Sequence, residues 1–133
     1  MKRIILLSVA IMMVFLSACE KPAGQGGDAT IKGKIWVEDW DANFNLLKYE
    51  FPGADEDVYI IYGDEVNYGD KISANNNGDF EFKYLRKGKY KVYVYSDQKQ
   101  SGTTPASKVA IVIDVEISSK KQVFDIGTIT IKK

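Results

Sequence analysis

The chain has 133 residues, and its 18 Lys and Arg residues balance 18 Asp and Glu residues to a formal net charge of zero. A chain of this length is expected to form one ordinary domain, and the balanced charge argues against nucleic acid as a partner. Histidine is absent and cysteine occurs once, which excludes both a histidine-dependent catalytic triad and a disulfide within the chain.

The first 19 residues carry the pattern of a processed leader. Lys2 and Arg3 precede an apolar run over residues 4–16, which ends in Leu16-Ser17-Ala18-Cys19. This is the layout of a signal peptide, and the run is shorter than the roughly 20 apolar residues of a transmembrane helix. The last four residues resemble the lipobox of bacterial lipoproteins. The resemblance implies that residues 1–18 are removed and that Cys19 is acylated. An uncleaved anchor or an ordinary secretory signal is the alternative.

Acylation of Cys19 would tether the protein to a membrane outside the cytoplasm, since two acyl chains are enough for stable attachment. Glu20 follows the cysteine, and the resemblance to lipoproteins then implies the outer membrane, with the domain facing the periplasm or the cell surface. The next residues, EKPAGQGGD, are rich in Gly and polar residues and lack apolar periodicity. Residues 19–28 are therefore predicted to be a flexible tether, and residues 29–133 the folded domain.

Alternation of apolar and polar residues begins near residue 30 and indicates half-buried β-strands. The first predicted strand places Ile31, Gly33, Ile35 and Val37 on one face. A second strand is predicted over residues 57–62, and a weaker third strand between residues 66 and 74. The connection between the first two is expected to be a long polar loop.

Two turn signals divide the middle of the chain. Asn77-Gly78 is typical of a hairpin with a type I′ turn, and Lys87-Gly88 indicates another turn. The flanking strands are predicted to bury Phe80, Phe82, Tyr90, Val92 and Val94 and to expose Glu81, Lys83 and Lys91. A polar loop follows, and two further strands are predicted over 108–117 and 123–131. About seven short strands without a helical period predict an all-β fold, an antiparallel Greek-key β-sandwich.

The segment from Gly78 to Val94, GDFEFKYLRKGKYKVYV, has the form G-x-F-x-F-x-x-L-x-x-G-x-Y-x-V-x-V. It resembles the signature of carboxypeptidase-regulatory-like domains, which belong with the transthyretin-like and Cna-B-like sandwiches. The resemblance extends over roughly residues 29–131, although the connection from Glu38 to Pro52 is longer than the usual turn of that family. It implies the sandwich fold and says almost nothing about function.

The first loop carries a candidate calcium site. Asp39, Asp41 and Asn43 offer oxygen ligands at alternate positions, and Glu50 falls where a twelve-residue calcium loop has its bidentate carboxylate. Phe44, however, occupies the position at which that loop requires glycine. The alternative is a polar loop in which Asp and Asn side chains cap turns. No other cofactor is expected.

A second candidate site is aromatic. Tyr59, Tyr93, Tyr95 and Trp36 point away from the faces assigned to the core, so neighbouring strands would gather them into an exposed platform. Such a platform fits a protein or glycan partner, because aromatic side chains are enriched at interfaces. The alternative is cross-strand pairing that only stabilises the sheet.

Together these features predict a non-enzymatic, membrane-anchored envelope lipoprotein whose sandwich is a binding or structural module. A carbohydrate-binding accessory protein is the alternative. The expected partners are the lipid membrane, reached through acylated Cys19, and an unidentified envelope protein or glycan.

Overall fold

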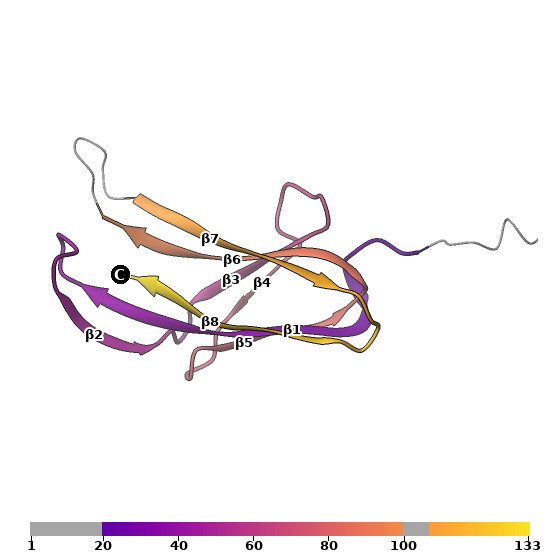
Figure 1. Ribbon diagram of the computed structural model, residues 1–133, viewed down its shortest axis with the longest axis horizontal. Helices are drawn as coiled ribbons and strands as arrows, with labels where there is room; N and C mark the ends of the chain where they lie inside the picture. Colours follow the sequence, from indigo (N-terminus) through magenta and orange to yellow (C-terminus); the bar gives the residue numbers. More distant parts are fainter. Residues whose placement is uncertain (1–19, 100–106) are drawn as a thin grey trace, which may run out of the picture.

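The computed structural model describes residues 20–99 and 107–133, so the leader and Cys19 lie outside the described residues. The chain forms two β-sheets that pack as the layers of a sandwich (Figure 1). The strands are β1 (Gln25–Trp40), β2 (Leu47–Pro52), β3 (Asp57–Tyr62), β4 (Asp70–Ser73), β5 (Asp79–Leu85), β6 (Gly88–Gln98), β7 (Ser107–Ile117) and β8 (Val123–Lys132). Within the described ranges, no helix has the length and apolar character needed to span a bilayer.

The first layer, here called the β1 sheet, is organised around one 16-residue strand. β8 pairs with β1 in parallel, and β5 and β2 pair with it antiparallel, one after the other along its second edge. Ile35 lies between Lys34, the last residue of β1 that pairs with β5, and Trp36, the first that pairs with β2. Its N–H donates to the carbonyl of Gly78 at 2.8 Å, and its carbonyl accepts from the N–H of Gly53 at 2.9 Å. The ladder along this edge is therefore nearly continuous.

The second layer, the β6 sheet, has the order β4-β3-β6-β7 and is antiparallel throughout. Consecutive strands change layer between β2 and β3, β4 and β5, β5 and β6, and β7 and β8. The two-layer all-β architecture agrees with the prediction. The parallel β1–β8 pair does not agree with the antiparallel arrangement that was expected.

The predicted hairpin at Asn77-Gly78 was wrong, because β4 and β5 belong to different sheets. Gly78 has φ of 80°, and a Cβ atom at this position would lie 2.3 Å from the carbonyl oxygen of Ile35. The glycine is therefore required for a layer-crossing turn that touches the backbone of β1. The Lys87-Gly88 turn also crosses between the layers.

The predicted inward residues are confirmed as core. Phe80 and Phe82 enter the core from the β1 sheet, Tyr90, Val92 and Val94 enter from the β6 sheet, and none is more than 4% exposed. The polar residues that alternate with them are exposed, namely Glu81, Lys83 and Lys91. The period of two along each strand produces this separation. Burial of each large side chain contributes about 1.5–3 kcal/mol.

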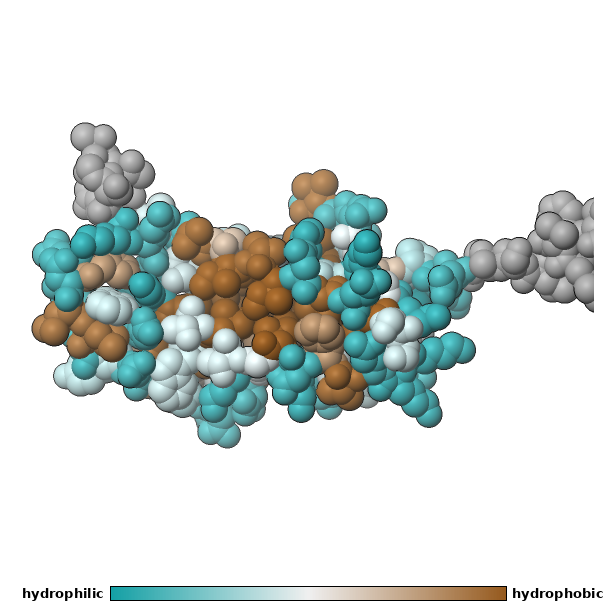
Figure 2. All heavy atoms as spheres, viewed as in Figure 1, coloured by the Kyte–Doolittle hydropathy of each residue, from teal (hydrophilic) through white to brown (hydrophobic). Residues whose placement is uncertain are grey.

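One side of the sandwich is open. Among the described strands, β7 pairs only with β6, and β8 pairs only with β1. Figure 2 shows a band of apolar side chains between these two strands. The half-buried residues that pack against the core from β7 and β8 are Ile111, Ile113, Phe124 and Ile126.

Most of the predicted tether is held against the domain. β1 begins at Gln25, four residues before the predicted start of the domain. Arg86 donates hydrogen bonds from Nε to the carbonyl of Pro22 at 2.7 Å and from its guanidinium to the carbonyl of Gln25. The prediction of a flexible tether over residues 19–28 is therefore wrong from residue 22 onward, because contacts from the β5–β6 turn fix a segment whose own composition favours flexibility.

Candidate functional site

Four tyrosines gather on the outer face of the β6 sheet. Tyr59 on β3 lies directly opposite Tyr93 on β6, and Tyr95 follows two positions later on the same face. Tyr68 comes from the β3–β4 loop. The rings of Tyr59 and Tyr93 stack with centroids 4.8 Å apart and planes 7° apart. We call Tyr59, Tyr68, Tyr93 and Tyr95 the tyrosine surface.

The other two rings stand at steep angles to this stack. The ring of Tyr68 lies 5.2 Å from that of Tyr59 at 69°, and the ring of Tyr95 lies 5.6 Å from it at 77°. These edge-to-face arrangements are the ones that aromatic quadrupoles favour. Tyr68 is 52% exposed and Tyr95 is 43% exposed, while Tyr59 and Tyr93 are half-buried. Contact with a ligand therefore falls mainly to Tyr68 and Tyr95.

Charged residues border the tyrosine surface. The Lys71 ammonium lies 5.9 Å from the centroid of the Tyr59 ring and 2.9 Å from a carboxylate oxygen of Asp57. The hydrogen bond to Asp57 raises the pKa of Lys71, and the same contact lowers the pKa of Asp57. Burial, followed by the neighbouring Tyr95, raises the pKa of Tyr93. All three groups therefore keep their usual protonation states near neutral pH.

A shallow depression adjoins the same surface. Its lining combines two tyrosines of the surface with carboxylates and ammonium groups, from Asp55, Glu56, Asp57, Tyr59, Tyr95, Lys108 and Lys133. The depression thus places hydrogen-bond donors and acceptors beside exposed aromatic rings.

Trp36 does not join the tyrosine surface. It lies on β1, where it pairs with Pro52 of β2 and with Thr130 of β8, so it belongs to the other sheet. Its indole N–H donates to the carboxylate of Glu50 at 3.4 Å. The sequence correctly placed Trp36 on an outer face, but it did not indicate which layer carries that face.

The candidate calcium ligands are not brought together. Asp39 lies in the β1–β2 ladder opposite Tyr49, and Glu50 accepts the hydrogen bond from Trp36. The Asp41 carboxylate caps the turn by accepting from the backbone N–H groups of Asn45 at 2.6 Å and Leu46 at 3.1 Å. These bonds lower the pKa of Asp41. Asn43 lies within the turn.

The arrangement is the turn-capping alternative, and residues 41–46 join β1 and β2 as a hairpin where a long loop was expected. The part of the chain that the structure describes has no group of three or more His, Cys, Asp or Glu side chains placed to hold a metal ion.

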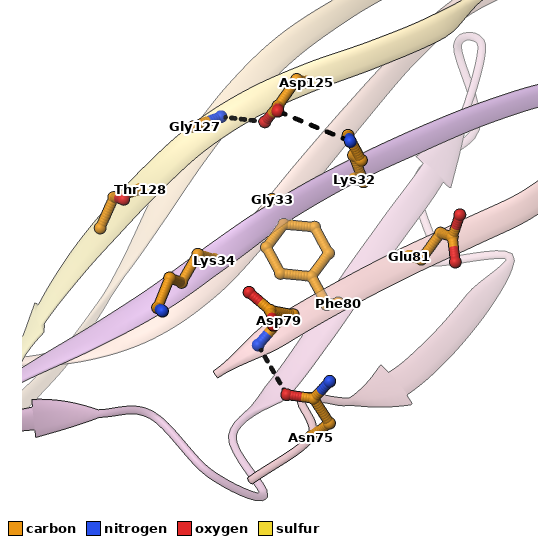
Figure 3. Close-up of a pocket in the computed structure, with 10 residues that line it drawn as sticks. All are labelled: Lys32, Gly33, Lys34, Asn75, Asp79, Phe80, Glu81, Asp125, Gly127 and Thr128. Carbon is orange, nitrogen blue, oxygen red and sulfur yellow. Dashed lines mark hydrogen bonds and ion pairs between the residues drawn. The ribbon is translucent and has the colours of Figure 1, made fainter. Parts of the chain in front are cut away.

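A polar hollow lies on the outer face of the β1 sheet (Figure 3). Gly33 leaves room for the ring of Phe80, whose Cζ would lie 2.6 Å from a Cβ atom at position 33. The Lys32 ammonium stands 3.9 Å from the Asp125 carboxylate, which also accepts from the N–H of Gly127 at 2.8 Å.

The charged residues around this hollow are Lys32, Lys34, Asp79, Glu81 and Asp125. Their mixed signs favour neither cations nor anions as ligands. The hollow was not anticipated because it depends on the irregular β1–β8 register near Gly127. The pairing of the first strand with the last is not visible in local sequence.

No family model matches the chain, and no curated protein matches its sequence. A crystal structure of a suggested carbohydrate-binding protein from Pseudomonas aeruginosa aligns with a TM-score of 0.48 and 10% identity, over 84% of this chain and 92% of that one. An (S)-allantoin synthase aligns with a TM-score of 0.44 and 10% identity, over 80% of this chain and 42% of the enzyme.

The minor pilin GBS52 of Streptococcus agalactiae aligns with a TM-score of 0.39 and 15% identity, over 80% of this chain and 46% of the pilin. None of these similarities is strong enough to carry a function from one protein to the other.

Proposed function

We propose that this chain is a bacterial envelope lipoprotein, anchored through acylated Cys19, whose sandwich is a non-enzymatic binding module. The observation that carries the binding role is the tyrosine surface, with Tyr68 and Tyr95 exposed beside the stacked pair. Exposed groups of aromatic side chains mark interaction sites more often than scattered ones do. The anchor is supported by the lipobox-like sequence that ends at Cys19.

The tyrosine surface is well placed for a partner of an anchored protein. Figure 1 shows the first described residues entering at one end of the sandwich, whereas the C-terminus lies at the opposite end. The tyrosines come from β3, β6 and the β3–β4 loop, on the flank of the molecule. A membrane at the N-terminal end would therefore leave this flank open to solvent.

We also propose that the domain belongs with the carboxypeptidase-regulatory-like and transthyretin-like sandwiches. The segment from Gly78 to Val94 supports this grouping, since the apolar positions of its motif are all buried, namely Phe80, Phe82, Leu85, Tyr90, Val92 and Val94. The segment spans β5 and β6, which lie in different layers, so its motif corresponds to a crossing from one layer to the other.

A glycan is a second candidate for the ligand. The depression beside Tyr59 and Tyr95 places carboxylates and the Lys108 ammonium next to an exposed ring. A sugar offers an apolar face for the ring and hydroxyl groups for the polar side chains, which matches this combination.

A glycan array probed with residues 20–133 tests the two candidates. Saturable binding that Tyr95→Ala weakens tenfold or more would support the glycan, since stacking of an aromatic ring contributes about 0.5–1.5 kcal/mol beyond the contact area that it buries. Tyr84→Ala is the matched control, because Tyr84 is 69% exposed on β5, in the other sheet.

A flat array would exclude the glycans tested. Capture of one defined envelope protein by the wild-type chain and by Tyr84→Ala, with loss in Tyr95→Ala, would then support a protein partner. Equal capture by all three would remove the tyrosine surface from the proposal.

The anchor is tested in cells with a fatty-acid probe. The wild-type chain is expected to take up the label and to sediment with membranes, and Cys19→Ser is expected to do neither while its domain still folds. Label that persists on the serine variant would exclude the lipobox assignment.

A further inference from the structure

We propose that the N-terminal end of the sandwich is a second membrane contact, in which a cluster of lysines binds the headgroups of anionic lipids. This proposal rests on the proposed acyl anchor at Cys19. The N-terminal end consists of residues 20–25, the β5–β6 turn and the turn between β7 and β8, which lie together at one end of the molecule (Figure 1).

Hydrogen bonds hold residues 22–25 against the domain. Arg86 binds the carbonyls of Pro22 and Gln25 through its side chain, and its backbone N–H donates to the carbonyl of Gly24 at 2.8 Å. The N–H of Gly24 donates to the buried hydroxyl of Tyr90 at 3.0 Å. The segment is thus held by Arg86 in the β5–β6 turn and by Tyr90 on β6.

The fixed segment lies close in sequence to the proposed anchor at Cys19. Three peptide units separate Cys19 from Pro22, and an extended chain spans at most about 3.3–3.6 Å per residue. An acyl group on Cys19 would therefore keep Pro22 within about 10 Å of the bilayer surface. This reach is comparable to the Debye length of about 8 Å at physiological ionic strength. Charges at this end would interact with lipid headgroups, whereas charges at the far end would be screened.

One depression at this end is lined mainly by basic side chains. Lys21, Arg86, Lys87 and Lys120 line one depression at this end, and Lys121 follows on the β7–β8 turn. The acidic residues lining the same depression are Glu20 and Asp28. Glu20 is held 2.9 Å from Lys87 by an ion pair. Basic groups therefore outnumber acidic groups in this depression, whereas Asp64 and Glu65 line a separate depression beside residues 22–25.

Three of the lysines are available for headgroups. Lys21, Lys120 and Lys121 are exposed, and within the described residues none lies within 4.0 Å of a carboxylate oxygen. The turn that carries the last two is fixed by Gln122, whose side-chain oxygen accepts from the N–H groups of Ser118 at 2.8 Å and Ser119 at 3.2 Å. Phosphate-bearing anionic headgroups match this preorganised cluster of ammonium groups.

The test uses a single acyl chain, because one chain gives only marginal and reversible membrane binding. Residues 19–133 contain all the buried residues of the core, and Cys19 is the only cysteine. A fourteen-carbon chain of the length found in myristate is attached chemically to Cys19. Partitioning is then measured on phosphatidylcholine vesicles and on vesicles with about one third phosphatidylglycerol, and circular dichroism verifies folding of each variant.

The wild-type chain is expected to bind the anionic vesicles tenfold or more tightly than the neutral ones, and to lose this preference at about 1 M salt, where the Debye length is about 3 Å. Each lysine near an anionic surface contributes about a fivefold factor, so Lys120→Gln/Lys121→Gln should weaken binding to anionic vesicles roughly 25-fold. Lys34→Gln/Lys48→Gln is the matched control, with the same change of charge on β1 and β2.

Equal partitioning of the wild-type chain on both kinds of vesicle would overturn the proposal, as would an equal loss in the control. Because the acyl chain is attached chemically, neither result depends on whether cells acylate Cys19. Failure of the anchor would appear only in the labelling experiment with Cys19→Ser.

Discussion

Replacement of Tyr90 by Phe tests whether the N-terminal segment is fixed by the hydroxyl group of this buried side chain. The hydroxyl accepts from the N–H of Gly24 at 3.0 Å and donates to the carbonyl of Arg86 at 2.6 Å. The ring itself is 1% exposed and packs edge-to-face against Tyr62 with centroids 5.9 Å apart. Phe keeps the ring and its packing, so the substitution removes only the hydrogen bonds of the hydroxyl group.

Each lost hydrogen bond costs about 0.5–1.5 kcal/mol, and an orphaned buried group costs about 1–3 kcal/mol. Because residues 22–25 can swing out to water, the lower values apply, and Tyr90→Phe should destabilise the domain by about 1–2 kcal/mol. Urea unfolding of residues 20–133 measures this loss, and amide exchange of Gly24 should accelerate in parallel. Tyr84→Phe is the control, because Tyr84 is 69% exposed. Equal midpoints for the two variants, with Gly24 still protected, would refute the attachment of this segment through Tyr90.

Three further predictions follow from the packing of the domain and its turns. Phe82→Ala should cost about 3–5 kcal/mol in urea unfolding because Phe82 is 3% exposed, whereas Lys83→Ala on the outer face should stay within about 0.5 kcal/mol; similar losses would reverse the inward and outward assignment of β5. Gly78→Ala should lower the melting temperature strongly, because the new Cβ would lie 2.3 Å from the Ile35 carbonyl oxygen. Gly63→Ala is the control and should lower the melting temperature less despite its positive φ, because its Cβ would meet no atom closer than 3.9 Å. The pKa of Asp41 is lowered, so the contribution of this carboxylate to stability is present above its unfolded pKa of about 3.9 and is lost as pH falls through the folded value. The NMR shifts of the Asn45 and Leu46 amides should follow this titration. Shifts that do not change between pH 5 and pH 2 would contradict the cap.

The sequence was sufficient to predict the core residues of β5 and β6. Phe80, Phe82, Tyr90, Val92 and Val94 are all buried, as their alternation with charged residues indicated. This success has a local cause: the side chains of a strand alternate with period two, so the pattern depends only on neighbours in sequence. The outward direction of Tyr59, Tyr93 and Tyr95 follows from the same period.

The partners of the strands could not be predicted in the same way. Asn77-Gly78 has the composition of a hairpin turn, but β5 pairs with β1, which lies far away in sequence. Likewise, Trp36 points outward as expected, although its strand belongs to the other layer. Pairing between distant strands depends on the packing of the whole domain and leaves no local signal.

The tyrosine surface was partly predictable and the N-terminal attachment was not. Tyr68 was not anticipated, because it comes from a loop without a strand pattern. Residues 22–25 have a composition typical of a flexible linker, and the groups that hold them, Arg86 and Tyr90, lie more than 60 positions away. The Pro and Gly content indicates only the flexibility that this segment would have in isolation.

The central claim, that the mature chain is an acylated lipoprotein, is tested most directly by the intact mass of the protein extracted from membranes. The account predicts a mass without residues 1–18 and with two or three acyl chains, which peptide mapping places on Cys19. A mass that retains the leader, or a mature chain with an unmodified cysteine, would contradict it.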